Sequence, residues 1–158
     1  MKCILLISLL LITNLYSIDM FKGVSIYPFG IVKHFEPEEE THEGNMEYFA
    51  ISKTFDYEDW CFEAGGGTFL DSYEVRSYKI FTNISHMDYT WGIFTPMLAI
   101  DLYSKGKEYS SDKRTQIIAP SFKLRIGDKD GLFMNIQPIP KVGDLTNGFV
   151  AVEFGYKF

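Results

Sequence analysis

The ten residues FVAVEFGYKF (149–158) decide the fold class. Their even-numbered positions are all apolar or aromatic, whereas the odd-numbered positions include Glu153, Gly155 and Lys157. A period of two is the signature of a β-strand, here with one apolar face and one mixed face. Aromatic residues gather toward the end of the stretch, as they do at the boundary of a lipid bilayer. The stretch therefore predicts a strand whose apolar face contacts lipid, and a terminal aromatic strand is typical of bacterial outer-membrane barrels.

The same alternation recurs through the chain and predicts eight strands, whereas helical periodicity is hard to find. The expected strands cover residues 22–34, 46–55, 60–69, 76–86, 91–103, 113–126, 131–138 and 148–158. The connections alternate between longer polar loops and tight turns, which is typical of an outer-membrane barrel with both termini in the periplasm. We therefore expect an all-β, eight-stranded antiparallel β-barrel in the bacterial cell outer membrane. A water-soluble barrel of the lipocalin type is the alternative.

The first 17 of the 158 residues have the pattern of a secretory signal peptide. Lys2 precedes an apolar run to Ile12 that is too short for a comfortable membrane-spanning helix, and Ser17 is a small residue at which a signal peptidase can cut. We expect residues 1–17 to be removed, which leaves one barrel domain over residues 18–158. The formal net charge of −6 excludes nucleic acid as a partner, because the chain lacks a basic surface.

The alternation also sorts the expected interior of the barrel by depth. The outer half is predicted to be apolar, with Phe49, Ile51, Met97, Ala99, Ile117, Ala119, Phe149 and Ala151. The periplasmic half is predicted to be charged, with Lys53, Glu63, Lys123, Arg125, Glu153 and Lys157, and charges buried in a closed lumen must pair. An apolar chamber above a charged floor suggests a pocket for an acyl chain. Simple packing of the apolar side chains is the alternative, and Lys79 is an exception in the apolar half.

Prolines fall within or beside several of the expected strands, at Pro28, Pro96, Pro120, Pro138 and Pro140. Proline cannot donate to a strand ladder, so each one marks a weakened pairing or a bulge. A weak seam could admit a lipid sideways from the bilayer. Relief of curvature in a small closed sheet is the alternative reason for these prolines.

Three polar residues are expected on the outer rim: His34 at the end of the first strand, and Asp71 and Ser72 after the third. Such a set can support acyl transfer, because the imidazole acts as base, the carboxylate orients it and the hydroxyl is a nucleophile or a hydrogen-bond donor. Asp-Ser is also a common loop dipeptide that favours turns.

The stretch FLDSY (residues 69–73), with His34 at the end of the first strand, resembles the lipid A palmitoyltransferase (PagP) family. Residues 138–140 and 147–158 are also similar to the last hairpin of that family. The resemblance implies an outer-membrane barrel with a hydrocarbon socket in the outer leaflet, and catalytic roles for His34, Asp71 and Ser72. It implies transfer of an acyl chain, typically palmitate, from a phospholipid to lipid A of lipopolysaccharide, with no metal or organic cofactor. We expect a monomer whose other contacts are outer-membrane lipids.

Two rival functions are considered beside this one. A non-catalytic small barrel would serve adhesion, resistance or membrane integrity. An outer-membrane lipid A deacylase is less favoured, because that family uses a His-x-Ser pair late in the chain and no histidine follows His86 here. The glutamate-rich loop of residues 35–45 is interpreted as a solvated loop, or as a place for divalent cations among lipopolysaccharide phosphates. The three glycines at 65–67 predict strand bending or a close backbone approach.

Overall fold

The computed structural model describes residues 21–35, 44–71, 74–107, 110–141 and 148–158. The predicted signal peptide and Ser72 lie outside this part of the chain. In the described residues the elements are β1 (Val24–His34), β2 (Gly44–Asn45), β3 (Phe49–Tyr57), β4 (Trp60–Leu70), β5 (Arg76–His86), the 3-10 helix η2 (Met87–Tyr89), β6 (Phe94–Lys107), β7 (Ser110–Gly127), β8 (Gly131–Ile139) and β9 (Phe149–Lys157).

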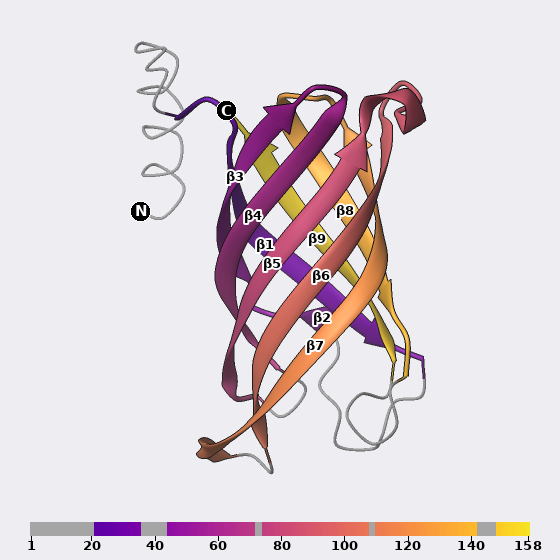
Figure 1. Cartoon of the computed structure of the whole chain (residues 1–158). Helices are drawn as coiled ribbons and strands as arrows, with labels where there is room; N and C mark the ends of the chain where they lie inside the picture. Colours follow the sequence, from indigo (N-terminus) through magenta and orange to yellow (C-terminus); the bar gives the residue numbers. More distant parts are fainter. Residues whose placement is uncertain (1–20, 36–43, 72–73, 108–109, 142–147) are drawn as a thin grey trace.

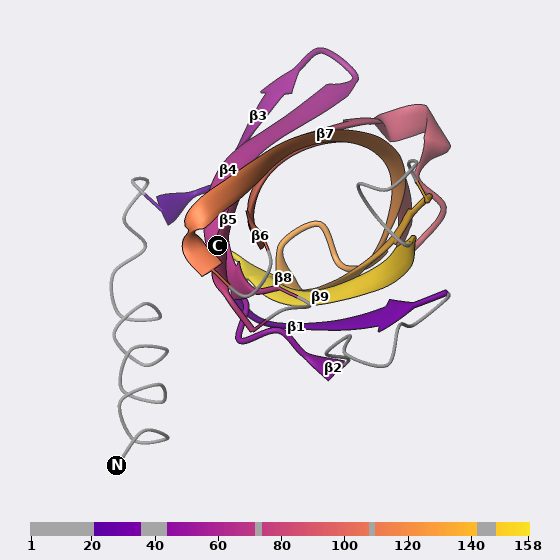
Figure 2. The ribbon, with the colours of Figure 1, turned by 90° about the horizontal axis from the view of Figure 1, so that it is seen from below.

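The strands form one closed antiparallel barrel (Figures 1 and 2). Strands β3 to β9 pair in chain order, and β9 pairs with β1 to close the ring. The two residues of β2 pair with β1 at Ile31 and Val32, beyond the residues of β1 that pair with β3. β2 and β3 therefore occupy one strand position between them, and the barrel has eight such positions. The predicted eight-stranded antiparallel barrel is confirmed.

The two ends of the barrel differ in their connections. β1 begins and β9 ends at one end, which we call the inner end, together with the tight turns after β3 and β7 (Figure 1). β1 and β4 end at the opposite end, which we call the outer end, and the β6–β7 hairpin extends past its neighbours there. The β7–β8 ladder runs only from Leu124–Gly127 against Phe133–Ile136, in the inner half of the described strands. Pro120 and Pro138 both lie beyond that ladder toward the outer end.

The outside of the barrel is apolar. Strands β1, β3 and β5 to β9 contribute to a band of exposed apolar side chains, which includes Phe29, Ile31, Phe49, Ile51, Phe55, Ile80, Leu98, Ile100, Leu102, Ile118, Phe122, Leu132 and Phe154. We call this band the apolar belt. It follows from the period of two in each strand, because successive side chains point alternately to the lipid and into the lumen. In the described part of the chain, no helix has the length and apolar character needed to cross a membrane.

Two glycines of β4 allow β3, β4 and β5 to pack closely on the lumen side. A Cβ at Gly65 would lie 2.6 Å from the Ile51 carbonyl oxygen and from the Phe81 ring. A Cβ at Gly67 would overlap Ala50 and the Phe49 carbonyl oxygen. The interpretation of the glycine triplet as a close backbone approach is therefore confirmed.

We expect Gly67→Ala to lower the free energy of unfolding by about 1–3 kcal/mol, because the added methyl group overpacks against backbone. Gly66→Ala is the matched control, since its Cβ would point outward and come no closer than 3.3 Å to the Lys79 carbonyl oxygen. Urea unfolding of the barrel in detergent micelles measures both variants. Equal stability of the two variants would contradict this account of the glycines.

Candidate functional site

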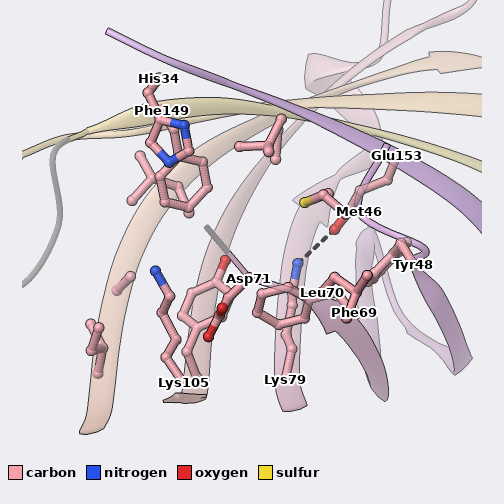
Figure 3. A pocket seen from close by; sticks show the side chains of 16 residues that line it. His34, Met46, Tyr48, Phe69, Leu70, Asp71, Lys79, Lys105, Phe149 and Glu153 are labelled. Carbon is pink, nitrogen blue, oxygen red and sulfur yellow. Dashed lines mark hydrogen bonds and ion pairs between the residues drawn. The ribbon is translucent and has the colours of Figure 1, made fainter. Parts of the chain in front are cut away.

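A cavity opens inside the barrel at its outer end (Figure 3). The space between the lining atoms is about 630 Å³, which includes the open mouth. We call this space the outer cavity. Its lining residues are Val32, His34, Met46, Tyr48, Phe69, Leu70, Asp71, Lys79, Tyr103, Lys105, Ile117, Ala119, Ile139, Phe149, Ala151 and Glu153.

The wall of the outer cavity is mostly apolar. Strands β1, β4, β7, β8 and β9 each turn an apolar side chain inward near the outer end, namely Val32, Phe69, Ile117, Ile139 and Phe149. Burial of hydrocarbon against such side chains is favourable, whereas a polar ligand would lose its hydration without replacement partners. The wall therefore suits an acyl chain.

The bottom of the outer cavity is ionic. The Lys79 ammonium group lies 2.6 Å from Glu153 Oε1 and 3.5 Å from Asp101 Oδ2 (the first contact is drawn in Figure 3). Lys123 Nζ contacts the other oxygen of Glu153 at 3.4 Å. All four side chains are almost fully buried, so these contacts are screened very little by water. We call Lys79, Asp101, Lys123 and Glu153 the ion-pair floor.

A second charged group fills the lumen below the ion-pair floor. Glu63 Oε2 accepts hydrogen bonds from Arg125 at 2.8 Å and from Asn83 at 2.9 Å, and Tyr27 donates to its other oxygen. The Arg125 guanidinium also lies over the Phe133 ring, 4.0 Å from its centroid. Three cations and three carboxylates therefore balance in the middle of the described lumen. That balance is what allows so many charges to be buried together.

His34 lies at the mouth of the outer cavity. It is the last residue of β1 and only 6% exposed, and its register partner on β9 is Phe149. The two rings are 5.6 Å apart between centroids, and Figure 3 shows them side by side at the edge of the cavity. The aromatic neighbour and the strand end together hold the imidazole at the border between the apolar wall and the outer loops.

Asp71 lines the same cavity from β4's side of the barrel. Its carboxylate accepts a hydrogen bond from Ser77 Oγ at 2.7 Å and from the Val75 amide at 3.1 Å, and the side chain is 4% exposed. These bonds tie the end of β4 to the start of β5 and fix the carboxylate at the rim. His34 and Asp71, which are 37 positions apart in the sequence, thus line one cavity. Ser72, the third residue of the predicted set, falls outside the described residues.

Lys105 is a rim residue that the sequence analysis did not identify. It lies on β6 and lines the outer cavity with His34 and Asp71. The expected strand stopped at residue 103, whereas β6 continues to Lys107. The alternation in the sequence could have identified it. Asp101 and Tyr103 face inward, so continuing the period of two puts residue 105 on the lumen side.

Half of the side chains predicted for the acyl pocket line the outer cavity: Ile117, Ala119, Phe149 and Ala151. Met97 and Ala99 also face the lumen, but they lie nearer the inner end. Lys79 faces the lumen, as its strand register predicted.

The predicted inward orientation of Phe49, Ile51 and Lys53 is wrong. Phe49 and Ile51 are 47% and 48% exposed, and both belong to the apolar belt. Their even-numbered neighbours Ala50 and Ser52 face inward instead. The reason is that Ala50 and Ser52 fit against the bare backbone at Gly65 and Gly67, whereas larger side chains would not, and lipid is the better environment for Phe and Ile.

The other charged residues predicted inside are in the lumen. Glu63, Lys123, Arg125, Glu153 and Lys157 are buried or nearly so. Lys157 lies at the inner end, where its ammonium group is 3.6 Å from Asp130. Among the described residues, no group of three histidine, cysteine or acidic side chains could hold a metal ion. Most of the acidic loop, including Glu36 to His42, lies outside the described part of the chain.

Comparison with known proteins supports the fold. No family model and no curated protein sequence matches the chain. Among solved structures, the outer membrane protein Ail of Yersinia pestis, described in a phospholipid bilayer nanodisc, is similar with a TM-score of 0.52. The match covers 87% of this chain and 100% of that chain at 14% sequence identity. At this identity the likeness concerns the fold alone.

The apolar belt and the charged lumen together define the class of the protein. A water-soluble barrel would present its polar residues outside, whereas this one presents aliphatic and aromatic side chains there and buries its ion pairs. The chain is a small β-barrel of the bacterial outer membrane.

We expect Glu153→Ala to lower the free energy of unfolding by about 3–5 kcal/mol, because it leaves Lys79 and Lys123 buried with less counter-charge. Glu47→Ala is the matched control, because Glu47 pairs with Arg76 at 2.7 Å but on the surface, where a pair contributes at most about 1 kcal/mol. Urea unfolding in detergent micelles gives both values. Similar losses in the two variants would refute the assignment of Glu153 to a supporting network.

Proposed function

We propose that this protein is an outer-membrane acyltransferase that moves a fatty acyl chain from a phospholipid to lipid A. The observation that carries the proposal is the outer cavity: an apolar chamber closed below by ion pairs, with His34 and Asp71 at its mouth. An acyl chain in the chamber would place its ester group beside these two residues. The resemblance of His34 and residues 69–73 to the lipid A palmitoyltransferase family supports the same assignment.

The proposed chemistry needs only side chains at the rim. The His34 imidazole removes the proton from the attacking lipid A hydroxyl, whose oxygen forms a new bond to the ester carbonyl carbon of the donor. The bond from that carbon to the glycerol oxygen breaks, and the leaving lysophospholipid oxygen takes the proton from His34. Ser72 donates a hydrogen bond to the carbonyl oxygen as negative charge develops there. If Ser72 attacks instead, the same proton transfers occur in two rounds through an acyl-serine.

The role proposed for Asp71 is electrostatic. Its hydrogen bonds from Ser77 and Val75 keep the carboxylate at the rim, where negative charge favours the protonated imidazole that forms during transfer. Asp71 also holds the chain that leads directly to Ser72. Its loss would therefore affect both the base and the hydroxyl.

The β7–β8 seam offers a way in for the donor. The ladder between these strands is confined to the inner half of the described barrel, and Pro120 and Pro138 lie beyond it. Missing ladder bonds at the level of the outer leaflet would let an acyl chain pass sideways into the outer cavity. Relief of curvature is the competing role for the two prolines.

A non-catalytic small barrel is the second candidate. The observation that favours it is the lumen network, which fills and stabilises the barrel without any need for a ligand. For such a barrel, His34 and Asp71 would only close the outer end, and their replacement would change stability alone.

The test is mass spectrometry of lipid A from bacteria that express the full chain. We expect lipid A to gain one acyl chain, and His34→Ala and Ser72→Ala to lower that gain by about 10²- to 10⁴-fold. His86→Ala is the matched control, because His86 packs on Trp60 in the turn region at the inner end, 4.6 Å between ring centroids. Each variant is checked for heat-resistant migration in gels, which reports a folded barrel.

Full activity of both rim variants, or no mass change with folded protein in the outer membrane, would refute the proposed function. A mass loss would instead indicate a deacylase.

A further inference from the structure

We infer that Cys61 is a modification site in the inner half of the barrel, where its thiol forms a mixed disulfide with a small aminothiol of the cysteine type, which carries an ammonium group and a carboxylate. The site opens at the inner end, away from His34 and Asp71, and does not depend on the proposed acyltransferase function. It follows from a polar cavity, a thiol that lines this cavity and a buried amide oxygen beside it.

A second cavity opens at the inner end of the barrel, below the group formed by Glu63 and Arg125. The space between its lining atoms is about 1100 Å³, which includes the open mouth. We call this space the inner cavity. Its wall carries charged, amide, hydroxyl and thiol groups, so it suits a polar ligand that can form hydrogen bonds. The lining residues include Asp56, Cys61, Asn83, Ser85, Arg125 and Lys157.

Cys61 presents its thiol to the inner cavity from β4. Because inward residues alternate along a strand, Cys61 lies one inward position nearer the mouth than Glu63. The thiol donates a hydrogen bond to the Asp56 carboxylate, and the hydroxyl of Ser85, the register partner of Cys61 on β5, donates to the sulfur. The side chain is only partly buried, so a small molecule that enters from the inner end can reach the sulfur.

The position of Cys61 determines what kind of partner its thiol can take. The one other cysteine of the sequence, Cys3, belongs to the expected signal peptide. An unpaired cysteine in an exported protein indicates pairing with another molecule or a reactive thiol, because disulfides form readily outside the cytoplasm. A disulfide holds its two Cα atoms within about 7 Å, so a cysteine of a second protein would have to enter the lumen. A small thiol compound meets this requirement.

Asn83 gives an independent indication of a ligand. Its side chain is 1% exposed and lines the inner cavity from β5. Nδ2 donates to Glu63 at 2.9 Å, which fixes the orientation of the amide, whereas Oδ1 has no hydrogen-bond partner among the described residues. A buried oxygen without a donor costs free energy, and an ammonium group in the cavity would supply the donor.

The β4–β5 register places this oxygen within reach of a group attached to the sulfur. Cys61 pairs with Ser85, and Glu63 pairs with Asn83, so Cys61 and Asn83 are diagonal neighbours on the lumen side of the ladder. Diagonal neighbours are separated by roughly 7–8 Å. A substituent of a few atoms on the sulfur spans that distance.

The charges around the sulfur match a zwitterion. The Asp56 carboxylate contacts the thiol, and the Arg125 guanidinium and the Lys157 ammonium group both interact electrostatically with Cys61. A cysteine joined to this sulfur carries an ammonium group and a carboxylate on one carbon atom. We expect its ammonium group to bond to Asn83 Oδ1 and Asp56, and its carboxylate to bond to Arg125 and Lys157.

The modification is thiol–disulfide exchange with a small disulfide such as cystine. The Cys61 thiol gives its proton to Asp56, and the thiolate attacks one sulfur of the disulfide. A new sulfur–sulfur bond to Cys61 forms as the old one breaks, and the leaving cysteine thiolate takes the proton from Asp56. One cysteine is released for each protein modified, and the disulfide is the only oxidant required.

The experiment measures how strongly the folded barrel favours this adduct. The full chain in detergent micelles is equilibrated with cystine and cysteine at a known ratio, and a second sample is equilibrated in urea, where the chain is unfolded. After an acid quench, mass spectrometry of the proteolytic peptide that contains Cys61 gives the modified fraction. We expect the exchange constant to be at least about tenfold higher for the folded barrel, because only the folded barrel presents the partners of the adduct. A constant equal to or below that of the unfolded chain overturns the inference.

Three further disulfides separate the two charges of the ligand. Cystamine carries only ammonium groups, dithiodipropionate carries only carboxylates, and hydroxyethyl disulfide carries neither. For each compound, the preference is the ratio of the folded to the unfolded exchange constant. We expect the preference to be highest for cystine, lower for the two singly charged compounds and lowest for hydroxyethyl disulfide. Equal preferences for cystine and hydroxyethyl disulfide would mean that the cavity does not recognise an aminothiol, and would overturn the inference.

Variants identify the partners of each charge. Asn83→Ala should lower the preference for cystine and cystamine about tenfold and leave that for dithiodipropionate unchanged. Lys157→Gln should lower the preference for cystine and dithiodipropionate but not that for cystamine. Lys53→Gln is the matched control, because Lys53 points away from the lumen and donates to the Lys22 carbonyl oxygen.

Only variants with heat-resistant migration are compared, and the two test variants are independent, so either one can carry the test alone. A folded variant that changes the preference for all compounds alike, or for none, overturns the assignment of that residue as a partner of the adduct.

Discussion

The balance of charge inside a narrow closed sheet is the constraint on which the rest of the structure depends. A barrel with lipid outside has only its lumen in which to place polar side chains, and in the described structure that lumen holds three cations and three carboxylates. None of these groups can be removed alone without leaving an uncompensated buried charge. The network therefore fixes how the strands face one another, and it also divides the lumen into an outer cavity and an inner space.

This division connects stability with the proposed activity. The outer cavity has a mostly apolar wall, and its bottom is ionic because the network begins there. The side chains that balance the buried charge are thus the same ones that form the bottom of the outer cavity. A substitution in this layer would have to preserve the charge balance, which restricts the substitutions that the protein can accept.

The sequence predicted the fold well because the period of two is a property of the strand itself. In β9 the even-numbered positions face lipid and the odd-numbered positions face the lumen, as expected. The inward placement of Phe49, Ile51 and Lys53 was wrong although β3 alternates clearly. Its odd-numbered positions are mostly apolar and its even-numbered positions small or polar, so the alternation itself favours the odd-numbered positions facing lipid. Contacts between strands also determine which face of β3 points inward. Gly65 and Gly67 on the neighbouring strand have no side chain and leave little room, so only small side chains of β3 fit beside them. Lys105 was missed because the expected strand ended too early. The pairing of the buried charges could not be predicted, because it depends on the register between strands far apart in the sequence.

The pairing of β1 with β9 has a consequence for how the molecule can form. Its register partners are separated by 115 positions (His34 and Phe149) to 132 positions (Ser25 and Lys157), so the ring is closed by the ladder of greatest sequence separation among the described strands. Contacts of this kind carry a large loop-closure entropy and are intrinsically slow to form. Until β9 arrives, the sheet has two open edges with unpaired backbone groups, which are templates for association with other chains. During assembly of this barrel, closure within one chain therefore competes with pairing between chains, and the pairing of β9 with β1 ends that competition.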